Sequence, residues 1–193
     1  MNWLAHLFLS KPDGAYRLGN LFGDLVKLKE RKTLNSCFSK GLECHLLIDS
    51  FTDKNVIFRR SKQRISPECK KYSGVLIDVF YDHFLATNWH MYSSVELPIF
   101  TQEVYSSFNE YWHLIPVFPR MVIYRMIAQD WLESYYYFHG IEATLKRIKA
   151  KLSNKHHEFF LVNSFLQQLE NNYDGLEKDF QEFFPKIIRY INN

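Results

Sequence analysis

The chain has 193 residues, of which 47% are hydrophobic, and a formal net charge of +3 at pH 7. This length is sufficient for one domain with its own core, and the 17 phenylalanines and 12 tyrosines exclude an intrinsically disordered chain. Seven glycines and six prolines are few for a turn-rich β protein. We therefore predict a single all-α domain over residues 1–193.

The charged residues are unevenly distributed along the chain. Residues 1–71 hold 14 Lys and Arg against 7 Asp and Glu, a balance of +7, whereas residues 72–193 hold 10 against 14, a balance of −4. A basic half favours an acidic substrate or partner. The alternative interpretation is an ordinary solvated surface.

Cysteine usage and the first residues indicate where the protein works. Cys37, Cys44 and Cys69 are odd in number and scattered, which is typical of reduced thiols in the cytoplasm. The apolar residues 1–10 lack the basic leader and the small-residue cleavage site of a signal peptide. No apolar run approaches the roughly 18 residues that a membrane helix requires. We therefore predict a soluble cytoplasmic protein.

Hydrophobic periodicity and helix-start signals predict helices along the whole chain. In the first half we expect them over residues 2–10, 15–29, 35–51, 58–64 and 66–91. In the second half we expect them over residues 98–112, 121–137, 141–152, 157–171 and 176–191, with Pro185 kinking or restarting the last. Gly19 and Gly23 lie four apart in the second helix, where each costs roughly 1 kcal/mol relative to alanine. We therefore expect another helix or a ligand to pack closely against them.

The predicted central helix carries two aspartates in apolar surroundings. Asp78 and Asp82 are one turn apart on the same face, and His83 stands beside them. Two carboxylates that close repel each other in a poorly hydrated place unless a proton or a cation neutralises them. A bound metal ion resolves this conflict. The alternative is that both aspartates face solvent on an ordinary amphipathic helix.

The same spacing of polar side chains recurs in three other segments. These sets are Asn2 with His6, Asn20 with Asp24, and His45 with Asp49 and Asp53. Each set places oxygen or imidazole ligands one helical turn apart among apolar residues. Four such sets within about 80 residues favour one shared site.

Several of these segments resemble the acyl carrier protein phosphodiesterase family. The matching pieces are Met-Asn-Trp-Leu-Ala-His-Leu at 1–7, Gly-Asn-Leu-Phe-Gly-Asp at 19–24, His-x-x-Ile-Asp-Ser-Phe-Thr-Asp at 45–53, Arg-Arg-Ser at 59–61, the central residues 74–85 and, more weakly, Tyr-Asp-Gly-Leu-Glu at 173–177. The resemblance implies a helical fold distantly like the HD-domain phosphohydrolases. It also implies an enzyme that removes the 4′-phosphopantetheine arm from holo-acyl carrier protein. The implied cofactor is a divalent cation, with Mn²⁺ as the first choice and Mg²⁺ or iron as the alternatives. The implied partner is the small acidic carrier protein, with no nucleic acid and no membrane.

The expected chemistry is hydrolysis of a phosphodiester by a metal-bound hydroxide. The predicted metal ligands are Asp24, His45, Asp49, Asp78 and Asp82. The predicted catalytic residues are His6, His83 and Asp53, with His6 or His83 as the general acid for the leaving serine oxygen. The predicted substrate-binding residues are Asn2, Asn20, Arg59, Arg60, Lys62 and Arg64. For the two asparagines, helix capping or packing is the alternative.

Two departures from the family pattern leave other functions open. Members of the family usually carry Arg after the residue matching His45, where this chain has Leu46, and Ser-His-Pro after Thr-Asp, where it has residues 54–56. One alternative is a phosphohydrolase acting on a nucleotide or another small phosphate ester with the same metal site. The other is a helical binding protein that has lost catalysis, for which Leu46 and Val56 are the sequence argument.

Overall fold

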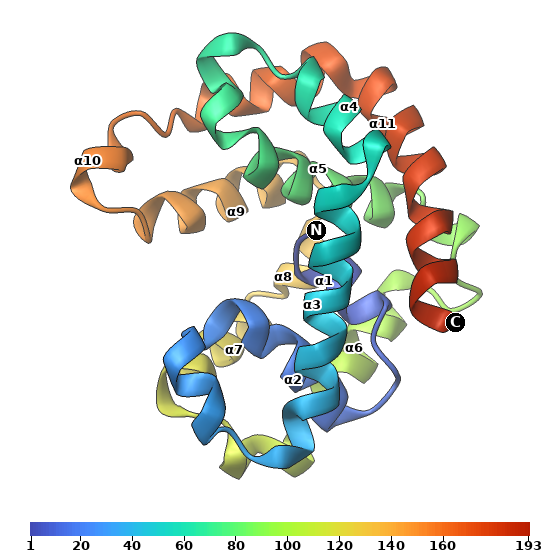
Figure 1. Cartoon of the computed structure of the whole chain (residues 1–193), viewed down its shortest axis with the longest axis vertical. Coiled ribbons are helices and arrows are strands. Elements are labelled where there is room, and N and C mark those ends of the chain that lie inside the picture. The colour runs from blue at the N-terminus through green and yellow to red at the C-terminus, as the bar shows by residue number, and fades with distance from the viewer.

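In the computed structural model the chain forms helices joined by short loops (Figure 1), and no strand occurs among the described residues. The backbone of all 193 residues is described, as are all side chains except those of Asn154 and Lys155. The α-helices are α1 Trp3–Phe8, α2 Gly14–Leu25, α3 Ser39–Lys54, α4 Val56–Arg64, α5 Ser73–Thr87, α6 Leu97–Ser107, α7 Val117–Ala128, α8 Trp131–Ser134, α9 Phe138–Ala150, α10 Asn154–His157 and α11 Val162–Asn192. Short 3₁₀ helices are η1 Leu28–Thr33, η2 Ser36–Phe38, η3 Pro67–Tyr72, η4 Trp89–Met91 and η5 Asn109–Leu114. The all-α class predicted from the sequence is confirmed, and none of the described helices is long and apolar enough to cross a lipid bilayer.

Helix α5 lies at the centre of the fold and packs against α1, α4, α9 and α11. Ile77, Val79 and Leu85 point to different sides of the helix and are all fully buried. A helix that is apolar around most of its circumference is stable only when neighbours cover it on all sides. The remainder of the predicted helix over 66–91 is the 3₁₀ turns η3 and η4 at its two ends.

The helices α2 and α3 approach each other closely, as the two glycines of α2 predicted. A methyl group on Gly19 would lie 2.1 Å from the Phe38 carbonyl oxygen, and one on Gly41 would lie 1.9 Å from the Tyr16 carbonyl oxygen. Neither position therefore accommodates a side chain without moving backbone. This contact fixes α3 against α2 and places the polar residues of the two helices side by side.

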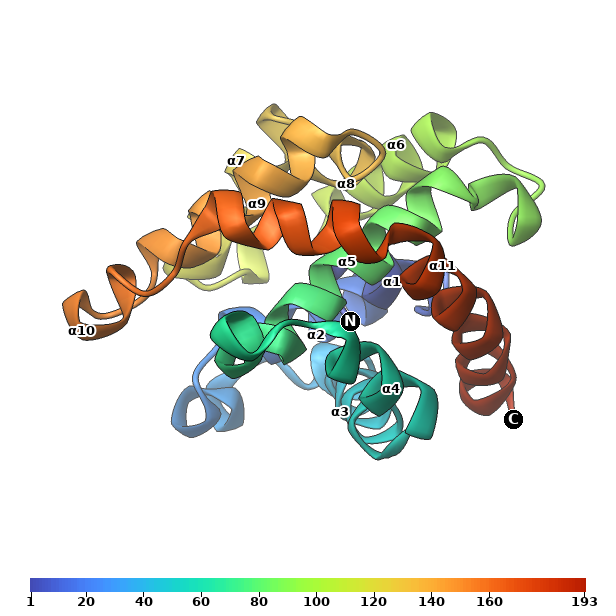
Figure 2. The same ribbon diagram turned by 90° about the horizontal axis from the view of Figure 1, so that it is seen from above.

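Two boundaries in the second half differ from the prediction. The segment 121–137 is divided between α7 and α8, because Asp130 adopts a left-handed backbone (φ 42°) and caps α8. The two closing helices expected over 157–171 and 176–191 are one helix, α11, which contains Pro185 and changes direction without ending (Figure 2). Its buried residues continue in helical register across the expected gap, from Leu169 to Leu176, so tertiary packing keeps the segment helical.

Candidate functional site

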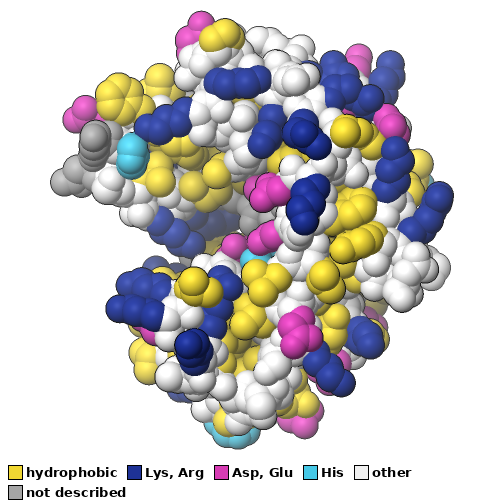
Figure 3. Space-filling view, viewed as in Figure 1, with side chains coloured by type: hydrophobic (Ala, Val, Ile, Leu, Met, Phe, Trp, Pro, Cys, Tyr) yellow, Lys and Arg dark blue, Asp and Glu magenta, His cyan; other side chains and the backbone are white. Residues whose placement is uncertain are grey.

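A cleft of about 690 Å³ opens between the amino-terminal segment and α5 on one side and α7, α8 and α9 on the other. Met1, Asn2 and Trp3 line it together with Asp24 from α2 and Asp78 from α5. Figure 3 shows the molecule hollowed here, with acidic side chains and a histidine at one edge and Lys or Arg side chains on another wall. The cleft thus lies between several of the residue sets that the sequence predicts to share a site.

Two aspartates of α5 hold the start of the chain at this cleft. The buried Asp82 carboxylate accepts hydrogen bonds from the backbone N–H groups of Leu4 (2.7 Å), Asn2 (3.2 Å) and Ala5 (3.3 Å). The first N–H groups of a helix have no partner within the helix, so Asp82 satisfies those of α1 and neutralises the positive end of its dipole. Burial raises the pKa of Asp82 to about 7, against the opposing effects of the amino terminus and these hydrogen bonds.

Asp78 has a different partner, the amino-terminal ammonium of Met1, at 2.7 Å. Burial alone lowers the pKa of this ammonium, but the adjacent Asp78 outweighs it and the pKa is raised. The repulsion predicted between Asp78 and Asp82 is therefore relieved by the amino terminus and by backbone N–H groups. Both Asp82 oxygens and Asp78 Oδ1 thus have partners other than the side chains of the other residue sets, while Asp78 also lines the cleft.

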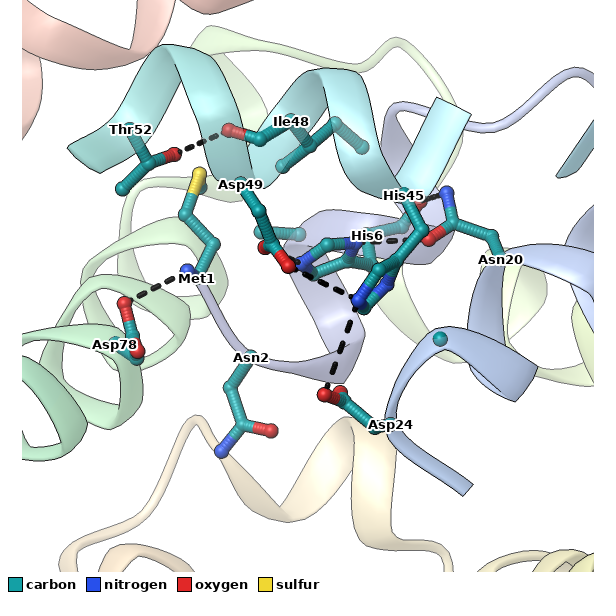
Figure 4. A network of polar contacts seen from close by, with 12 residues as sticks. Met1, Asn2, His6, Asn20, Asp24, His45, Ile48, Asp49, Thr52 and Asp78 are labelled. Atoms are coloured by element: carbon teal, nitrogen blue, oxygen red, sulfur yellow. Dashed lines mark hydrogen bonds and ion pairs between the residues drawn. The ribbon is translucent and has the colours of Figure 1, made fainter. Parts of the chain in front are cut away.

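The remaining sets do converge beside the cleft, where Asp49 meets two histidines (Figure 4). Asp49 lies 3.0 Å from His45 Nε2 and 3.4 Å from His6 Nε2, and Asp24 lies 3.9 Å from His45 Nε2. The two imidazole rings stack with their centroids 4.5 Å apart. Residues from α1, α2 and α3 thus form one cluster, which we call the histidine–aspartate cluster: His6, Asp24, His45 and Asp49.

Neighbouring side chains fix the orientation of each member of the cluster. The Asn20 side-chain oxygen accepts a hydrogen bond from His6 Nδ1 (2.8 Å), while its amide nitrogen donates to the His6 carbonyl (3.1 Å). This arrangement places a proton on Nδ1 and directs Nε2 toward Asp49. Trp3 Nε1 donates to Asp24 at 2.9 Å. Gly23 leaves room for the His45 ring, since a methyl group there would lie 2.1 Å from it.

Burial and charge act in opposite directions on Asp49. Burial alone raises the pKa of this carboxyl, but the close contacts with His45 and His6 and their positive charge outweigh it, so the pKa is lowered. Asp49 therefore remains ionised at neutral pH. His6 Nε2 and His45 Nδ1 are buried without a hydrogen-bond partner. The cluster holds an anionic carboxylate beside an imidazole nitrogen that faces it without a hydrogen bond.

Within the described part of the chain, no group of three or more His, Cys, Asp and Glu side chains is arranged to hold a metal ion. In the histidine–aspartate cluster, the Asp49 carboxylate is paired with both imidazole rings, so the three side chains face one another. The donor types nevertheless suit a divalent ion, because imidazole nitrogens and carboxylate oxygens are ligands of zinc, manganese and iron.

The opposite wall of the cleft is basic, and the sequence analysis missed it. Arg125 of α7, Arg147 of α9 and Lys151 line the cleft, and none of them forms an ion pair with a described carboxylate. Arg147 stacks over Trp131, 4.1 Å from the ring centroid, and Lys151 lies over Trp3. Burial lowers the pKa values of Arg147 and Lys151. We call these three residues the basic wall.

The arginines of α4, predicted to bind substrate, have another role. Asp179 of α11, which is 1% exposed, accepts hydrogen bonds from Arg60 (2.8 Å) and Arg64 (2.7 Å). Arg60 also pairs with Glu182 at 2.7 Å. Arg59 and Lys62 belong to the same helix, and all four cations are absent from the lining of the cleft. Arg60 and Arg64 thus join α4 to α11, whereas Arg59 donates to the Lys54 carbonyl and Lys62 lies over Phe58. The substrate-binding role of the four residues stays a prediction.

Two predicted catalytic residues also lie outside the cleft. His83 Nδ1 donates to the Tyr135 carbonyl at 2.8 Å and its Nε2 accepts from the Tyr173 hydroxyl at 3.1 Å. Burial lowers the pKa of His83, which favours a neutral ring. Asp53 is exposed one turn beyond Asp49 on α3. Asn2 caps α1 and also lines the cleft, so its capping alternative is confirmed.

The structure is an all-helical protein in which a basic wall and Asp24 line one cleft, and the other members of the histidine–aspartate cluster adjoin this cleft through Asp24. This combination is suited to phosphate esters. A family model described as acyl carrier protein phosphodiesterase matches residues 1–187. The chain belongs to this family.

Curated relatives agree over the whole length. A protein named acyl carrier protein phosphodiesterase from Serratia proteamaculans (strain 568) is 28% identical over 190 residues, which cover 98% of this chain and 96% of that one. One of the same name from Enterobacter sp. (strain 638) is 27% identical over 196 residues, covering 100% of this chain and 98% of the relative. No solved structure is significantly similar to the chain, so its likeness to HD-domain proteins stays a prediction.

Proposed function

We propose that the protein hydrolyses the phosphodiester bond between 4′-phosphopantetheine and a serine of holo-acyl carrier protein. The observation that carries the proposal is that the basic wall lines the same cleft as Asp24, through which the histidine–aspartate cluster adjoins the cleft. The family description and the names of the relatives, acyl carrier protein phosphodiesterase, support this choice of ester. A cleft of about 690 Å³ is large enough for an extended prosthetic arm.

The basic wall supplies the binding of the phosphate. A phosphodiester carries one negative charge, and guanidinium groups match its oxygens with paired hydrogen bonds. Arg147 is held over Trp131 and donates to the Thr144 hydroxyl. Its remaining donors have no carboxylate partner within the described chain, so a phosphate does not have to displace an internal ion pair to bind.

The histidine–aspartate cluster supplies the chemistry. A water molecule attacks phosphorus, the bond from phosphorus to the serine oxygen breaks, and that oxygen needs a proton as it leaves. Of the two histidines predicted as the acid, His6 fits this role because it belongs to the cluster, whereas both nitrogens of His83 are engaged elsewhere. Asn20 holds the His6 ring in place.

A divalent cation, with Mn²⁺ as the first choice, is part of the proposal. Asp24, His45 and Asp49 are the side chains that would hold it, since they contribute two carboxylates and an imidazole. They are paired with one another and not arranged around an ion, so binding would require them to turn toward it. When bound, such an ion lowers the pKa of water and offsets charge on phosphoryl oxygens. Asp78 and Asp82 are left out of this set because the amino terminus and α1 occupy their oxygens.

Leu46 and Val56, at which the sequence departs from the family pattern, are not evidence that catalysis has been lost. Leu46 is 51% exposed and Val56 is 71% exposed, and neither lines the cleft. The departures from the family pattern therefore lie on the surface of α3 and at the start of α4. The histidine–aspartate cluster and the basic wall are unaffected by them.

The direct test incubates the purified protein with Mn²⁺ and holo-acyl carrier protein and measures the mass of the carrier. We expect the mass of phosphopantetheine to be lost, with Asp49→Ala at least about a thousandfold slower and without detectable Mn²⁺ binding by calorimetry. Asp53→Ala, one turn along the same helix and exposed, is the matched control and keeps wild-type activity. Hydrolysis of nucleotides with no effect on the carrier would favour the small-ester alternative, and inactivity on both would favour a binding protein.

A further inference from the structure

Helix α7 carries an apolar stripe that the fold leaves uncovered. Val117, Met121 and Tyr124 lie at i, i+4 and i+7 and are 73%, 52% and 66% exposed. The opposite face of the helix, with Ile123 and Met126, is buried in the core. Aromatic and methionine side chains in an exposed row next to a ligand cleft are typical of protein-binding surfaces.

The stripe continues directly into the cleft. Phe118, Val122 and Arg125, which follow the stripe around the helix, line the cavity. Phe118 is itself 57% exposed, so it forms the edge between the outer surface and the interior. A protein seated on α7 would therefore stand at the entrance of the cavity that is lined by the basic wall and by Asp24 of the histidine–aspartate cluster.

The surroundings of the stripe are positively charged, against the trend of their half of the sequence. Residues 72–193 have a balance of −4, yet residues 117–151 hold six Lys and Arg against three Asp and Glu. The sequence of α7 itself has two arginines and no acidic residue. The neighbouring α9 adds Lys146, Arg147 and Lys149, and Lys151 follows it. A partner that fits this region combines an apolar contact with acidic side chains.

We propose that the acidic acyl carrier protein docks on the exposed stripe of α7, with its acidic side chains facing the cations of α7 and α9. The proposal rests on the proposed function and names the surface that receives its substrate. It replaces the docking surface predicted on α4, whose arginines are paired with Asp179 and Glu182. From α7, the prosthetic arm enters past Phe118 and its phosphate reaches the basic wall.

The experiment compares the double variant Met121→Glu, Tyr124→Glu with wild type. Binding to apo-acyl carrier protein, which lacks the arm, is measured by calorimetry, and hydrolysis is measured with holo-carrier and with bis(p-nitrophenyl) phosphate. We expect the dissociation constant for the apo-carrier and the KM for holo-carrier to rise at least about tenfold, because central apolar contacts carry most of the affinity of an interface. Hydrolysis of the small diester stays at the wild-type rate, since neither substituted residue lines the cleft.

Two controls make the outcome decisive. Leu46→Glu, Leu47→Glu places the same charges on exposed leucines of α3 (51% and 49%) and is expected to bind the carrier as wild type does. Lys62→Glu tests the α4 surface and is expected to have little effect. A larger loss with Lys62→Glu than with the α7 variant overturns the proposal. Unchanged carrier binding by the α7 variant also overturns the proposal. The same holds if the wild-type protein uses the stripe to bind anionic vesicles or a second copy of the chain and does not bind the carrier.

The outcome also separates this proposal from the proposed function. If wild type binds the apo-carrier through α7 but hydrolyses neither ester, the activity is wrong and the docking surface stands. If wild type hydrolyses holo-carrier and the α7 variant does so with an unchanged KM, the activity stands and the docking surface is wrong.

Discussion

Two basic regions of the molecule differ in what surrounds their charges. On α4, hydrogen bonds to Glu182 and Asp179 raise the pKa of Arg60, and a hydrogen bond to Asp179 raises that of Arg64. On the basic wall, burial lowers the pKa values of Arg147 and Lys151; the nearby Asp24 opposes this for Lys151 only in part, and no described carboxylate forms an ion pair with either residue. The first region is neutralised by α11 and joins two helices. The second keeps its positive charge uncompensated in a cleft, which is the state that an anionic ligand requires.

The largest expected effect separates the two regions by activity. Arg147→Gln with Lys151→Gln removes two groups that we propose to bind the phosphate, and we expect kcat/KM for holo-acyl carrier protein to fall by about a thousandfold. Arg59→Gln with Lys62→Gln removes the same two charges from α4 and is expected to leave kcat/KM within about twofold of wild type. Steady-state kinetics with both double variants checks this. Equal losses in the two would show that only the overall charge matters.

The next effect separates the regions by stability. Asp179→Asn leaves Arg60 and Arg64 without their shared anion, and we expect the free energy of unfolding to fall by about 2 kcal/mol. Glu182→Gln, which removes a 47% exposed partner of Arg60, should cost less than about 0.5 kcal/mol. Urea denaturation measures both. We expect the folded Asp179→Asn variant to keep wild-type activity. A loss of activity at unchanged stability would instead show that the arginines of α4 take part in substrate binding.

The sequence alone predicted the parts of the site that lie on one helix. His45 and Asp49 are four apart, and the helical period places them together. The glycines of α2 predicted close packing, which is what brings Asp24 to the same cluster. Asp78 and Asp82 have the same spacing but hold the amino terminus and α1 instead. Spacing shows that two carboxylates share a face, but not which distant donors reach them.

The basic wall was missed for a related reason. Arg125 and Arg147 are separated by α8 and by the break at Asp130, and they lie in the half of the sequence with a negative balance. Arg147 and Lys151 are four apart, so their shared face was a signal, but the denser run of cations on α4 was the more conspicuous one. Only the fold shows that Asp179, more than 100 residues away, already pairs with the α4 arginines.

The smallest effect concerns the pH dependence of the basic wall. Burial lowers the pKa of Lys151 below the ordinary value of 10.5, although the nearby Asp24 opposes this. A lysine binds an anion only while it is protonated, so its contribution is complete well below the lowered pKa and is lost as the pH rises through it. A phosphodiester keeps its single charge over this range, which makes the lysine the group that titrates. We expect the KM of the wild type for bis(p-nitrophenyl) phosphate to rise severalfold at a pH below 10.5.

The matched variant is Lys151→Arg, because arginine keeps its charge throughout this range. In this variant the alkaline rise in KM is expected to disappear, while the KM at neutral pH stays near that of wild type. Lys62→Arg makes the same exchange on α4 and should keep the wild-type profile. Circular dichroism at each pH confirms that the fold persists. If the profiles of wild type and Lys151→Arg coincide, Lys151 does not contact the phosphate, and the basic wall reduces to its two arginines.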